Sequence, residues 1–178
     1  AGGFREPHWD WSVEHYYHHW FASDRHILGL IEELGWSDKV LFPWPITAAY
    51  HNDRFYALDG PLSHAFPKMK WLDRLPGSGT LARGYYAFRY PALSFLDTVR
   101  YGIAGVKLLL AGSWERFEEV TAYEWLLRWM GQRNLDALWE PLLVGKFGPY
   151  FKEVNAAWFW ARVKARTPRL GTFVGGFQ

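Results

Sequence analysis

The fold class is decided by residues 49–56, Ala49-Tyr50-His51-Asn52-Asp53-Arg54-Phe55-Tyr56. The two central residues, Asn52 and Asp53, tolerate the left-handed backbone that a two-residue hairpin turn requires. The aromatic residues on both sides favour strands. This run therefore predicts an antiparallel hairpin, and it is the strongest strand signal in the chain.

Helical patterns dominate the sequence on both sides of this hairpin. Upstream, Ser23 is a predicted N-cap for an apolar run over residues 27–34, and Gly35 ends that run. Residues 14–21, which are rich in aromatic side chains and His, are also predicted to be helical. Downstream helices are expected from Ser94 onward, after the capping box Thr121-x-x-Glu124, over residues 135–144 with a bend at Pro141, and after Asn155.

Residues 75–84 are predicted to form a loop because Gly and Pro are frequent there. The sum is an α+β fold, mostly helical with a small antiparallel hairpin or sheet. The length of 178 residues suits one domain over residues 1–178.

The charge and the apolar content of the sequence limit the kinds of binding partner that are expected. The net charge of +2 gives no strong electrostatic footprint for nucleic acid, so no nucleic-acid partner is expected. The longest apolar run, residues 103–111, is short and contains Lys107, so it is not expected to span a membrane. A cytoplasmic protein is expected, with peripheral membrane association as the less favoured alternative.

The 12 Trp, 13 Phe and 10 Tyr either fill a core of large rings or also line a ligand pocket or a surface covered by another domain.

The sequence lacks a dinucleotide fingerprint, a phosphate-binding loop that ends in Gly-Lys-Ser/Thr, and a Gly-x-Ser-x-Gly nucleophile elbow. There is no strand–GxGxxG–helix fingerprint for a dinucleotide; Gly77-Ser78-Gly79 imitates only its first half. Glu14, His15, His18 and His19 have helical spacing that suits zinc, but the flanking aromatic residues and the lack of a second ligand cluster favour packing or the polar lining of a ligand site. No metal is expected.

Several segments together resemble one family. They are Gly2-Gly3-Phe4-Arg5, residues 14–21 followed by Ser23-Asp24, residues 121–125, residues 139–143 with residues 145–148, residues 154–158, and Gly175-Gly176-Phe177-Gln178. The pattern resembles bacterial protoporphyrinogen oxidase-like oxidoreductases, within the wider amine oxidase, phytoene desaturase and protoporphyrinogen oxidase superfamily of FAD enzymes. The order and spacing of the segments carry the resemblance, which covers most of the chain.

The resemblance implies that this chain is the substrate-binding, or cap, domain of a longer FAD-dependent enzyme. The flavin fingerprint is then expected before a segment like Gly2-Gly3, and the chain is expected to return to the flavin domain at Gly175-Gly176, so Ala1 and Gln178 are not expected to be natural ends. FAD is implied for the complete protein and none for this chain alone, which is expected to be inactive by itself. The implied partners are the FAD-binding domain of the same protein and a small hydrophobic or aromatic substrate.

The resemblance also suggests residues that contact the substrate. His18 and His19 are expected to provide polar lining near the flavin, Lys146 to anchor an acidic substrate group, and Trp139 and Phe147 to form apolar walls. No catalytic base is identified. Two other readings stay open: a free-standing module that binds a hydrophobic ligand in an aromatic cleft, and a membrane- or partner-docking domain that uses the helix over residues 95–110.

Overall fold

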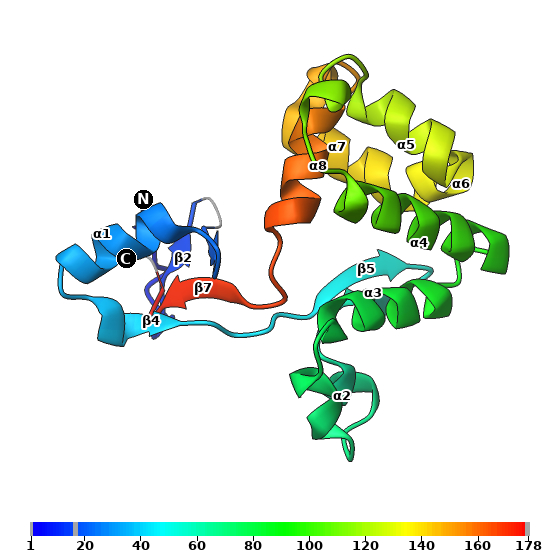
Figure 1. Cartoon of the computed structure of the whole chain (residues 1–178). Helices are drawn as coiled ribbons and strands as arrows, with labels where there is room; N and C mark the ends of the chain where they lie inside the picture. The colour runs from blue at the N-terminus through cyan, green and yellow to red at the C-terminus, as the bar shows by residue number, and fades with distance from the viewer. Residues whose placement is uncertain (1, 16–17, 177–178) are drawn as a thin grey trace. The chain divides into compact units, whose positions relative to one another are not determined.

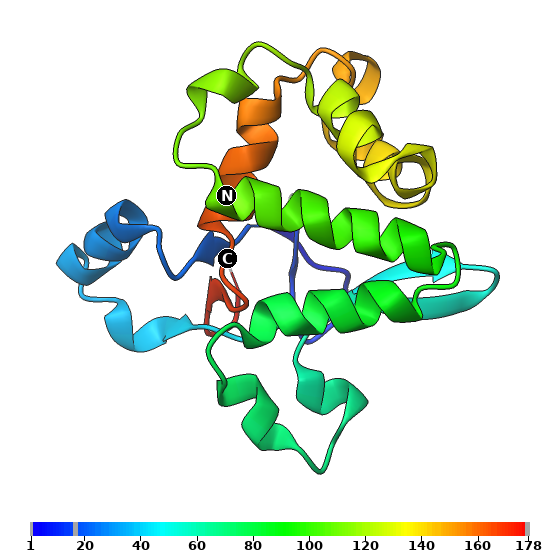
Figure 2. The same cartoon turned by 45° about the vertical axis from the view of Figure 1, so that its right-hand side comes forward.

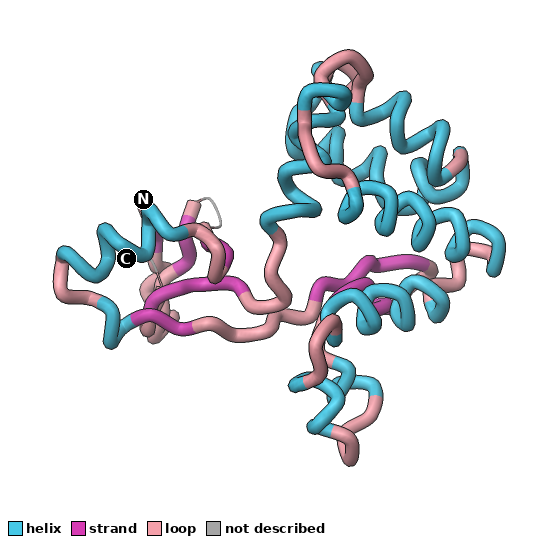
Figure 3. The backbone as a smooth tube through the Cα atoms, viewed as in Figure 1, coloured by secondary structure: helices cyan, strands magenta, loops and turns pink. Residues whose placement is uncertain are grey.

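The computed structural model describes residues 2–15 and 18–176, which form helices and small antiparallel sheets (Figures 1 and 3). The predicted α+β class is confirmed at this level. The chain divides into two compact units: unit 1 consists of residues 1–45 and 167–178, and unit 2 of residues 46–166. A single substrate-binding domain over both units stays a prediction.

Unit 1 is built from short strands. β3 (Trp20–Phe21), β7 (Leu170–Phe173) and β4 (Val40–Leu41) form one sheet in that order, with β7 antiparallel to both neighbours. β1 (Gly3–Phe4) and β2 (Val13–Glu14) pair separately. The first and last segments of the chain are therefore joined through β7.

The predicted helix after residue 23 is confirmed as α1 (Arg25–Glu33), which is followed by the short 3₁₀ helix η1 (Ser37–Lys39). Asp24 rather than Ser23 is the residue before α1, and its carboxylate accepts a hydrogen bond from the Phe21 N–H at 2.8 Å. Gly35 has φ +69°, the left-handed backbone expected after a helix end.

The predicted helix over residues 14–21 is wrong, although Tyr16 and Tyr17 lie outside the described residues. Glu14 ends β2, and Trp20 and Phe21 form β3. Both β3 side chains are 6% exposed, and they pair with β7, about 150 residues later in the chain. Burial against a distant strand overrides the local helical pattern, which a single sequence window does not reveal.

The predicted hairpin is confirmed in unit 2 as β5 (Thr47–His51) and β6 (Arg54–Asp59). Asn52 and Asp53 have φ values of 48° and 59°, so both adopt the left-handed conformation of a type I′ turn. This turn matches the right-handed twist of the two strands, which explains why the short sequence signal was sufficient.

The predicted loop over residues 75–84 is only partly correct, because α3 (Ser78–Arg89) begins within it. Gly77, at φ +76°, precedes the helix, and Gly79 and Gly84 lie inside it. Ala82, Tyr86 and Ala87 are buried on one face of α3, so packing offsets the low helix propensity of glycine. The shorter α2 (Leu62–Ala65) and η2 (Lys70–Arg74) precede it.

The rest of unit 2 is helical and contains the main core. Its elements are α4 (Phe95–Leu110), η3 (Glu115–Phe117), α5 (Ala122–Met130), α6 (Gln132–Asn134), the π-helical turn η4 (Leu135–Trp139), α7 (Glu140–Phe147), η5 (Gly148–Tyr150) and α8 (Ala156–Ala165). α5 contacts both α4 and α8, and the core lies among these three helices.

Within residues 2–15 and 18–176, no helix combines the length and the apolar content needed to cross a membrane.

The predicted helix boundaries of this region are largely confirmed. Thr121 and Glu124 form the capping box of α5, and the Asn155 side chain accepts a hydrogen bond from the Trp158 N–H at the start of α8. Pro141 directly follows the π-helical turn η4 within a helical run that continues from α6 to α7, and the bend predicted at this proline stays a prediction.

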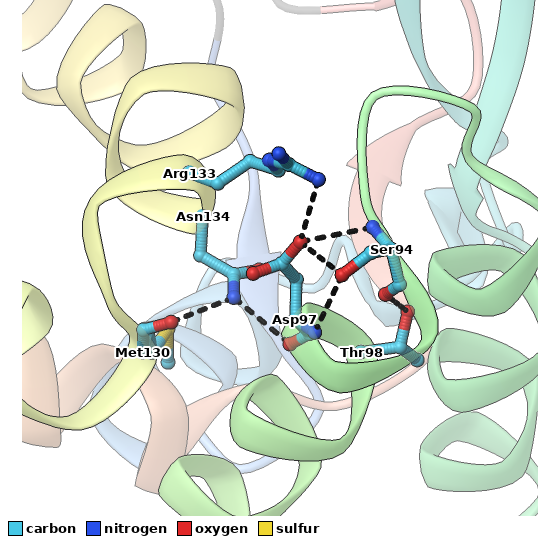
Figure 4. A network of polar contacts seen from close by, with 6 residues as sticks. All are labelled: Ser94, Asp97, Thr98, Met130, Arg133 and Asn134. Atoms are coloured by element: carbon cyan, nitrogen blue, oxygen red, sulfur yellow. Dashed lines mark hydrogen bonds and ion pairs between the residues drawn. The ribbon is translucent and has the colours of Figure 1, made fainter.

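A second capping box connects α4 to α6 (Figure 4). The Asp97 carboxylate accepts hydrogen bonds from the Ser94 N–H at 2.9 Å and the Ser94 hydroxyl at 2.5 Å, and it lies 3.4 Å from Arg133. The amide of the buried Asn134 donates to the carbonyls of Asp97 and Met130, each at 2.8 Å. These bonds hold the first turn of α4 against α6.

The pKa of Asp97 is lowered by the hydrogen bonds from the Ser94 side chain and backbone, with smaller contributions from Arg133 and Arg100. Because the folded-state pKa lies below the ordinary value of 3.8, the ionised carboxylate stabilises the fold above that pH. This contribution is lost as the pH falls through the lowered pKa.

Replacing Asp97 by Asn is therefore expected to lower the free energy of unfolding by about 1 kcal/mol at neutral pH. The difference from the wild type should shrink below about pH 4, as measured by urea unfolding at several pH values. Glu153→Gln, at an exposed site, is the control and should show no such change. An Asp97→Asn difference that stayed constant down to pH 2 would contradict the assigned role of the charge.

Candidate functional site

A buried carboxylate between two arginines is the main polar feature inside unit 2. Asp59, at the end of β6, is 7% exposed. Its Oδ2 accepts a hydrogen bond from Arg166 Nη2 at 2.9 Å and lies 3.5 Å from Arg83 Nε, while Oδ1 accepts the Gly60 N–H at 2.8 Å. Two guanidinium groups around one carboxylate leave an excess positive charge.

Three elements that are distant in the sequence position these groups. Asp59 ends β6, Arg83 lies in the middle of α3, and Arg166 directly follows α8. The Arg83 and Arg166 side chains are 23% and 35% exposed, so both retain access to solvent. The pair is therefore held in place by Asp59 and can still meet a ligand.

A set of contacting aromatic side chains lies in the same unit. The rings of Tyr101 and Trp139 stack with centroids 6.2 Å apart, and Trp139 meets Phe159 edge-on at 4.8 Å. Burial raises the pKa of Tyr101, and the charges of Arg83, Asp59 and Arg166 also act on it. The largest of these effects is burial; the two arginine charges lower the pKa and the Asp59 charge raises it.

The indole N–H of Trp139 is buried and has no hydrogen-bond partner among the described residues. Such a donor is uncommon in a folded protein, because an unpaired buried N–H costs about 1–3 kcal/mol. An acceptor supplied by a ligand would remove this cost. We call Asp59, Arg83, Tyr101, Trp139 and Arg166 the aromatic–arginine cluster.

A second group of rings lines the neighbouring small core. Tyr90 lies 5.9 Å from Tyr56 and 5.8 Å from His51, all as edge-to-face contacts. Burial raises the pKa of Tyr90, and the neighbouring Tyr56 raises it further. Tyr101 and Trp139 pack against this small core as well as against the main one, so they lie where the two cores meet.

The chemistry of the aromatic–arginine cluster suits recognition of a flat apolar molecule that carries an anionic group. Guanidinium groups bind carboxylate or phosphate with strong, directed hydrogen bonds. Stacked rings provide a large apolar contact area. Across the part of the chain that the structure describes, no group of three His, Asp or Glu side chains is placed to hold a metal ion.

Four of the predicted site residues lie in the N-terminal part of unit 1. His18 Nδ1 lies 2.5 Å from the Glu14 carboxylate, and Glu14 pairs with Gly3 across β1 and β2. His19 meets the ring of Phe21 at 5.7 Å, and the Gly2 carbonyl accepts the His15 N–H at 3.0 Å. The structure therefore brings Gly3 close to the Glu14–His18 pair.

The predicted glycine pair follows β7 in the same unit. Gly175 and Gly176 have φ values of 83° and 85°, and the Gly176 N–H donates to the Phe173 carbonyl at 3.1 Å. Two consecutive left-handed residues favour glycine. The pair thus makes a turn that other residues would strain, and its predicted role as the return to a flavin domain stays a prediction.

The other predicted site residues lie in unit 2. Trp139 belongs to the aromatic–arginine cluster, whereas Lys146 is exposed on α7. The ring of Phe147 meets Trp158 edge-on at 4.8 Å. Trp139 and Phe147 thus contact two different rings of α8, and the nine predicted residues are divided between the two units.

Sequence reasoning missed four members of the aromatic–arginine cluster. Arg83 fell in a segment predicted to be a loop, and Arg166 at a helix end where cations are common. Asp59 and Tyr101 belong to no motif that was recognised in the sequence. The one usable signal was Asp59-Gly60 at the end of a predicted strand. If the end of that strand is buried, the charged Asp59 needs a partner of opposite charge.

Comparisons with protein families, with curated proteins and with solved structures found no match to this chain. The resemblance to flavin-dependent oxidoreductases therefore rests on the sequence segments alone. The chemistry of the aromatic–arginine cluster rests on its geometry, which is independent of that resemblance.

Proposed function

We propose that this chain is the substrate-binding domain of an FAD-dependent oxidoreductase of the protoporphyrinogen oxidase-like type. Its partner is a flavin-binding domain of the same protein, and its substrate is a small aromatic or hydrophobic molecule. In such an enzyme the flavin accepts the hydride, and the protein orients the substrate and excludes water. The aromatic–arginine cluster holds the substrate.

The connection between the two units is the observation that carries this proposal. The chain leaves unit 1 after Pro45 and returns at Thr167, and the flanking strands β4 and β7 are antiparallel neighbours. Unit 2 is therefore an insertion within unit 1. Insertion of one unit into another is well tolerated, because the ends of a domain usually lie at its surface and close together. The sequence resemblance likewise implies a chain that leaves the flavin-binding domain and later returns to it.

The aromatic–arginine cluster gives the second support. It combines an excess positive charge, stacked rings and an indole N–H without a partner in the described residues. These groups match a planar substrate with a carboxylate better than they match an uncharged polyene. The cluster replaces Lys146 as the proposed anchor for the acidic group.

Flavin content tests the assignment to this enzyme class. Residues 1–178 and the natural gene product that contains them are purified in parallel, and their visible absorbance is compared. We expect flavin absorbance in the natural gene product and none in residues 1–178. Stoichiometric FAD bound to residues 1–178 alone, or a natural gene product that never binds flavin, would overturn the proposal.

Ligand binding tests the role of the aromatic–arginine cluster. Protoporphyrin IX, a planar dicarboxylate, is titrated while tryptophan fluorescence is followed, with its dimethyl ester as the uncharged comparison. Arg83→Met is expected to weaken binding of the diacid about tenfold, because one charge-assisted contact is lost. Binding of the ester should change little.

Lys146→Met is the matched control for this titration. Lys146 is exposed on α7, so its replacement is expected to leave the affinity for the diacid unchanged. If Lys146→Met weakened binding and Arg83→Met did not, the anchor would be on α7 instead. Tight binding together with a natural gene product free of flavin would identify a free-standing binding module.

A further inference from the structure

Asp59 holds the two arginines of the aromatic–arginine cluster in different ways. Arg166 Nη2 donates a hydrogen bond to Asp59 Oδ2 at 2.9 Å, whereas Arg83 Nε lies 3.5 Å from the same oxygen. The Nε–H of Arg83 is buried and has no hydrogen-bond partner among the described residues. Asp59 therefore satisfies Arg166 and leaves Arg83 with unused capacity to donate hydrogen bonds.

The position of the Asp59 carboxylate is fixed on both sides. Its backbone pairs with Thr47 on β5, and its Oδ1 accepts the Gly60 N–H at 2.8 Å, so Oδ2 is the oxygen that meets the arginines. α3, which carries Arg83, contacts β6 and α4, and α4 contacts α8 (Figures 1 and 2). The carboxylate cannot turn away from the arginines without losing its bond to Gly60.

The charges of this group do not cancel. Arg83 and Arg166 each carry a guanidinium group, which stays protonated in proteins. Among the described residues, no acidic side chain other than Asp59 forms an ion pair with either arginine. Two positive charges and one negative charge leave a single positive charge, which a ligand with one negative charge would neutralise.

A second negative charge on the ligand would have no positive partner in this group. Transfer of an unpaired charge from water into a partly buried site is costly, and the Asp59 carboxylate would repel it. A carboxylate carries one charge, whereas a phosphate monoester carries nearly two above about pH 7, because its second pKa is about 6. A dicarboxylate with its acidic groups on separate side chains presents one of them at a time.

We propose that Asp59 determines the charge specificity of the aromatic–arginine cluster. By cancelling one of the two arginine charges, Asp59 makes the cluster select a flat ligand with a single carboxylate and reject a dianionic phosphate on the same ring system. This inference rests on the proposed function of the cluster as the substrate anchor, and it adds the class of the acidic group that is anchored.

Three probes with the same rings test the charge preference of the wild type. Binding of 2-naphthoate, 2-naphthyl phosphate and methyl 2-naphthyl phosphate to residues 1–178 is measured by calorimetric titration at about pH 8, where only the phosphate monoester is a dianion. The methyl ester keeps the phosphate shape with one charge, so it separates charge from shape. We expect both monoanions to bind at least about tenfold more tightly than the dianion. Equal or tighter binding of the dianion, or no binding of any probe, would overturn the proposal.

Replacing Asp59 by Asn removes the negative charge with little change in size. The group then carries two positive charges, so the affinity for the dianion is expected to rise at least about tenfold relative to both monoanions. Circular dichroism verifies that the variant is folded, because loss of a buried counter-charge destabilises a protein. Unchanged relative affinities of the three probes would overturn the proposal.

A double variant keeps the test decisive if Asp59→Asn alone does not fold. Asp59→Asn combined with Arg83→Met leaves Arg166 as the one charged residue of the group, which restores a single positive charge without an unpaired second arginine. The preference for monoanions is therefore expected to return to within about threefold of the wild-type value. A double variant that favours the dianion would contradict charge counting as the basis of selection.

Asp53→Asn is the matched control on the same hairpin. Asp53 is exposed in the turn, where Asn also tolerates the left-handed backbone. Six strand residues separate it from Asp59, a distance of about 20 Å, which exceeds the screening length at physiological salt. The relative affinities of the three probes should stay those of the wild type. Equal shifts in Asp53→Asn and Asp59→Asn would mean that overall charge, and not the cluster, sets the preference.

The proposed function and this inference can fail separately. If Arg83→Met weakens binding of protoporphyrin IX while Asp59→Asn leaves the relative affinities of the three probes unchanged, the anchor stands and the charge selection by Asp59 is wrong. If Arg83→Met has no effect on protoporphyrin IX, the anchor itself is wrong and the inference is overturned with it. The flavin content of the natural gene product depends on neither result.

Discussion

Replacing Leu126 by Ala is expected to lower the free energy of unfolding of unit 2 by about 3 kcal/mol. Leu126 is fully buried in α5, which packs against both α4 and α8. Truncation removes buried methyl groups and leaves a cavity among helices that close only partly around it. Urea unfolding followed by far-UV circular dichroism measures the change, because most helical residues belong to unit 2.

The neighbouring residue provides the control. Leu127 lies on the same helix and is 37% exposed, so Leu127→Ala is expected to change the free energy of unfolding by less than about 1 kcal/mol. Two leucines one position apart should thus differ severalfold in effect. Equal losses for the two variants would mean that α5 is rotated relative to the described packing.

Replacing Gly171 by Ala is expected to destabilise unit 1 by about 2–3 kcal/mol. A Cβ added at Gly171 would collide with the indole ring of Trp20, which pairs with Gly171 across β3 and β7. Trp20 is 6% exposed, so its ring has little room to move away. Hydrogen exchange should become faster in peptides that cover β3, β4 and β7 and should stay unchanged in α5 and α8.

Gly29 is the control for this substitution. It lies inside α1 of the same unit, and a Cβ there would meet no atom within 4 Å. Gly29→Ala is therefore expected to stabilise unit 1 by about 0.5–1 kcal/mol, since alanine has the higher helix propensity. If both substitutions had the same sign, close packing of Trp20 on Gly171 would not be the cause of the Gly171→Ala effect.

Whether a prediction from the sequence succeeded depended on how far apart in the sequence the interacting residues lie. The hairpin at Asn52-Asp53, the capping box at Thr121 and the cap at Asn155 were all predicted and are confirmed. Each depends on residues within four positions of one another. The helix predicted over residues 14–21 failed because its structure depends on β7, which lies at the other end of the chain.

The candidate site shows the same difference between short-range and long-range interactions. Trp139 was predicted to be a wall residue and lies in the aromatic–arginine cluster. The three charged residues Asp59, Arg83 and Arg166 contact one another, although they lie on β6, on α3 and directly after α8, far apart in the sequence. Electrostatic pairing across such distances leaves no periodic or spacing signal.

The sequence by itself determined the α+β class, most helix ends in unit 2 and the hairpin turn, because short-range hydrogen bonds and backbone preferences set these features. Only the tertiary structure decided that unit 2 is inserted within unit 1, that Asp59 joins two arginines, and that α4 keeps an exposed apolar face. Which side of an apolar helix is buried depends on what packs against it. A helical wheel reveals two apolar faces on α4, and only the positions of α5 and α8 show which one is covered.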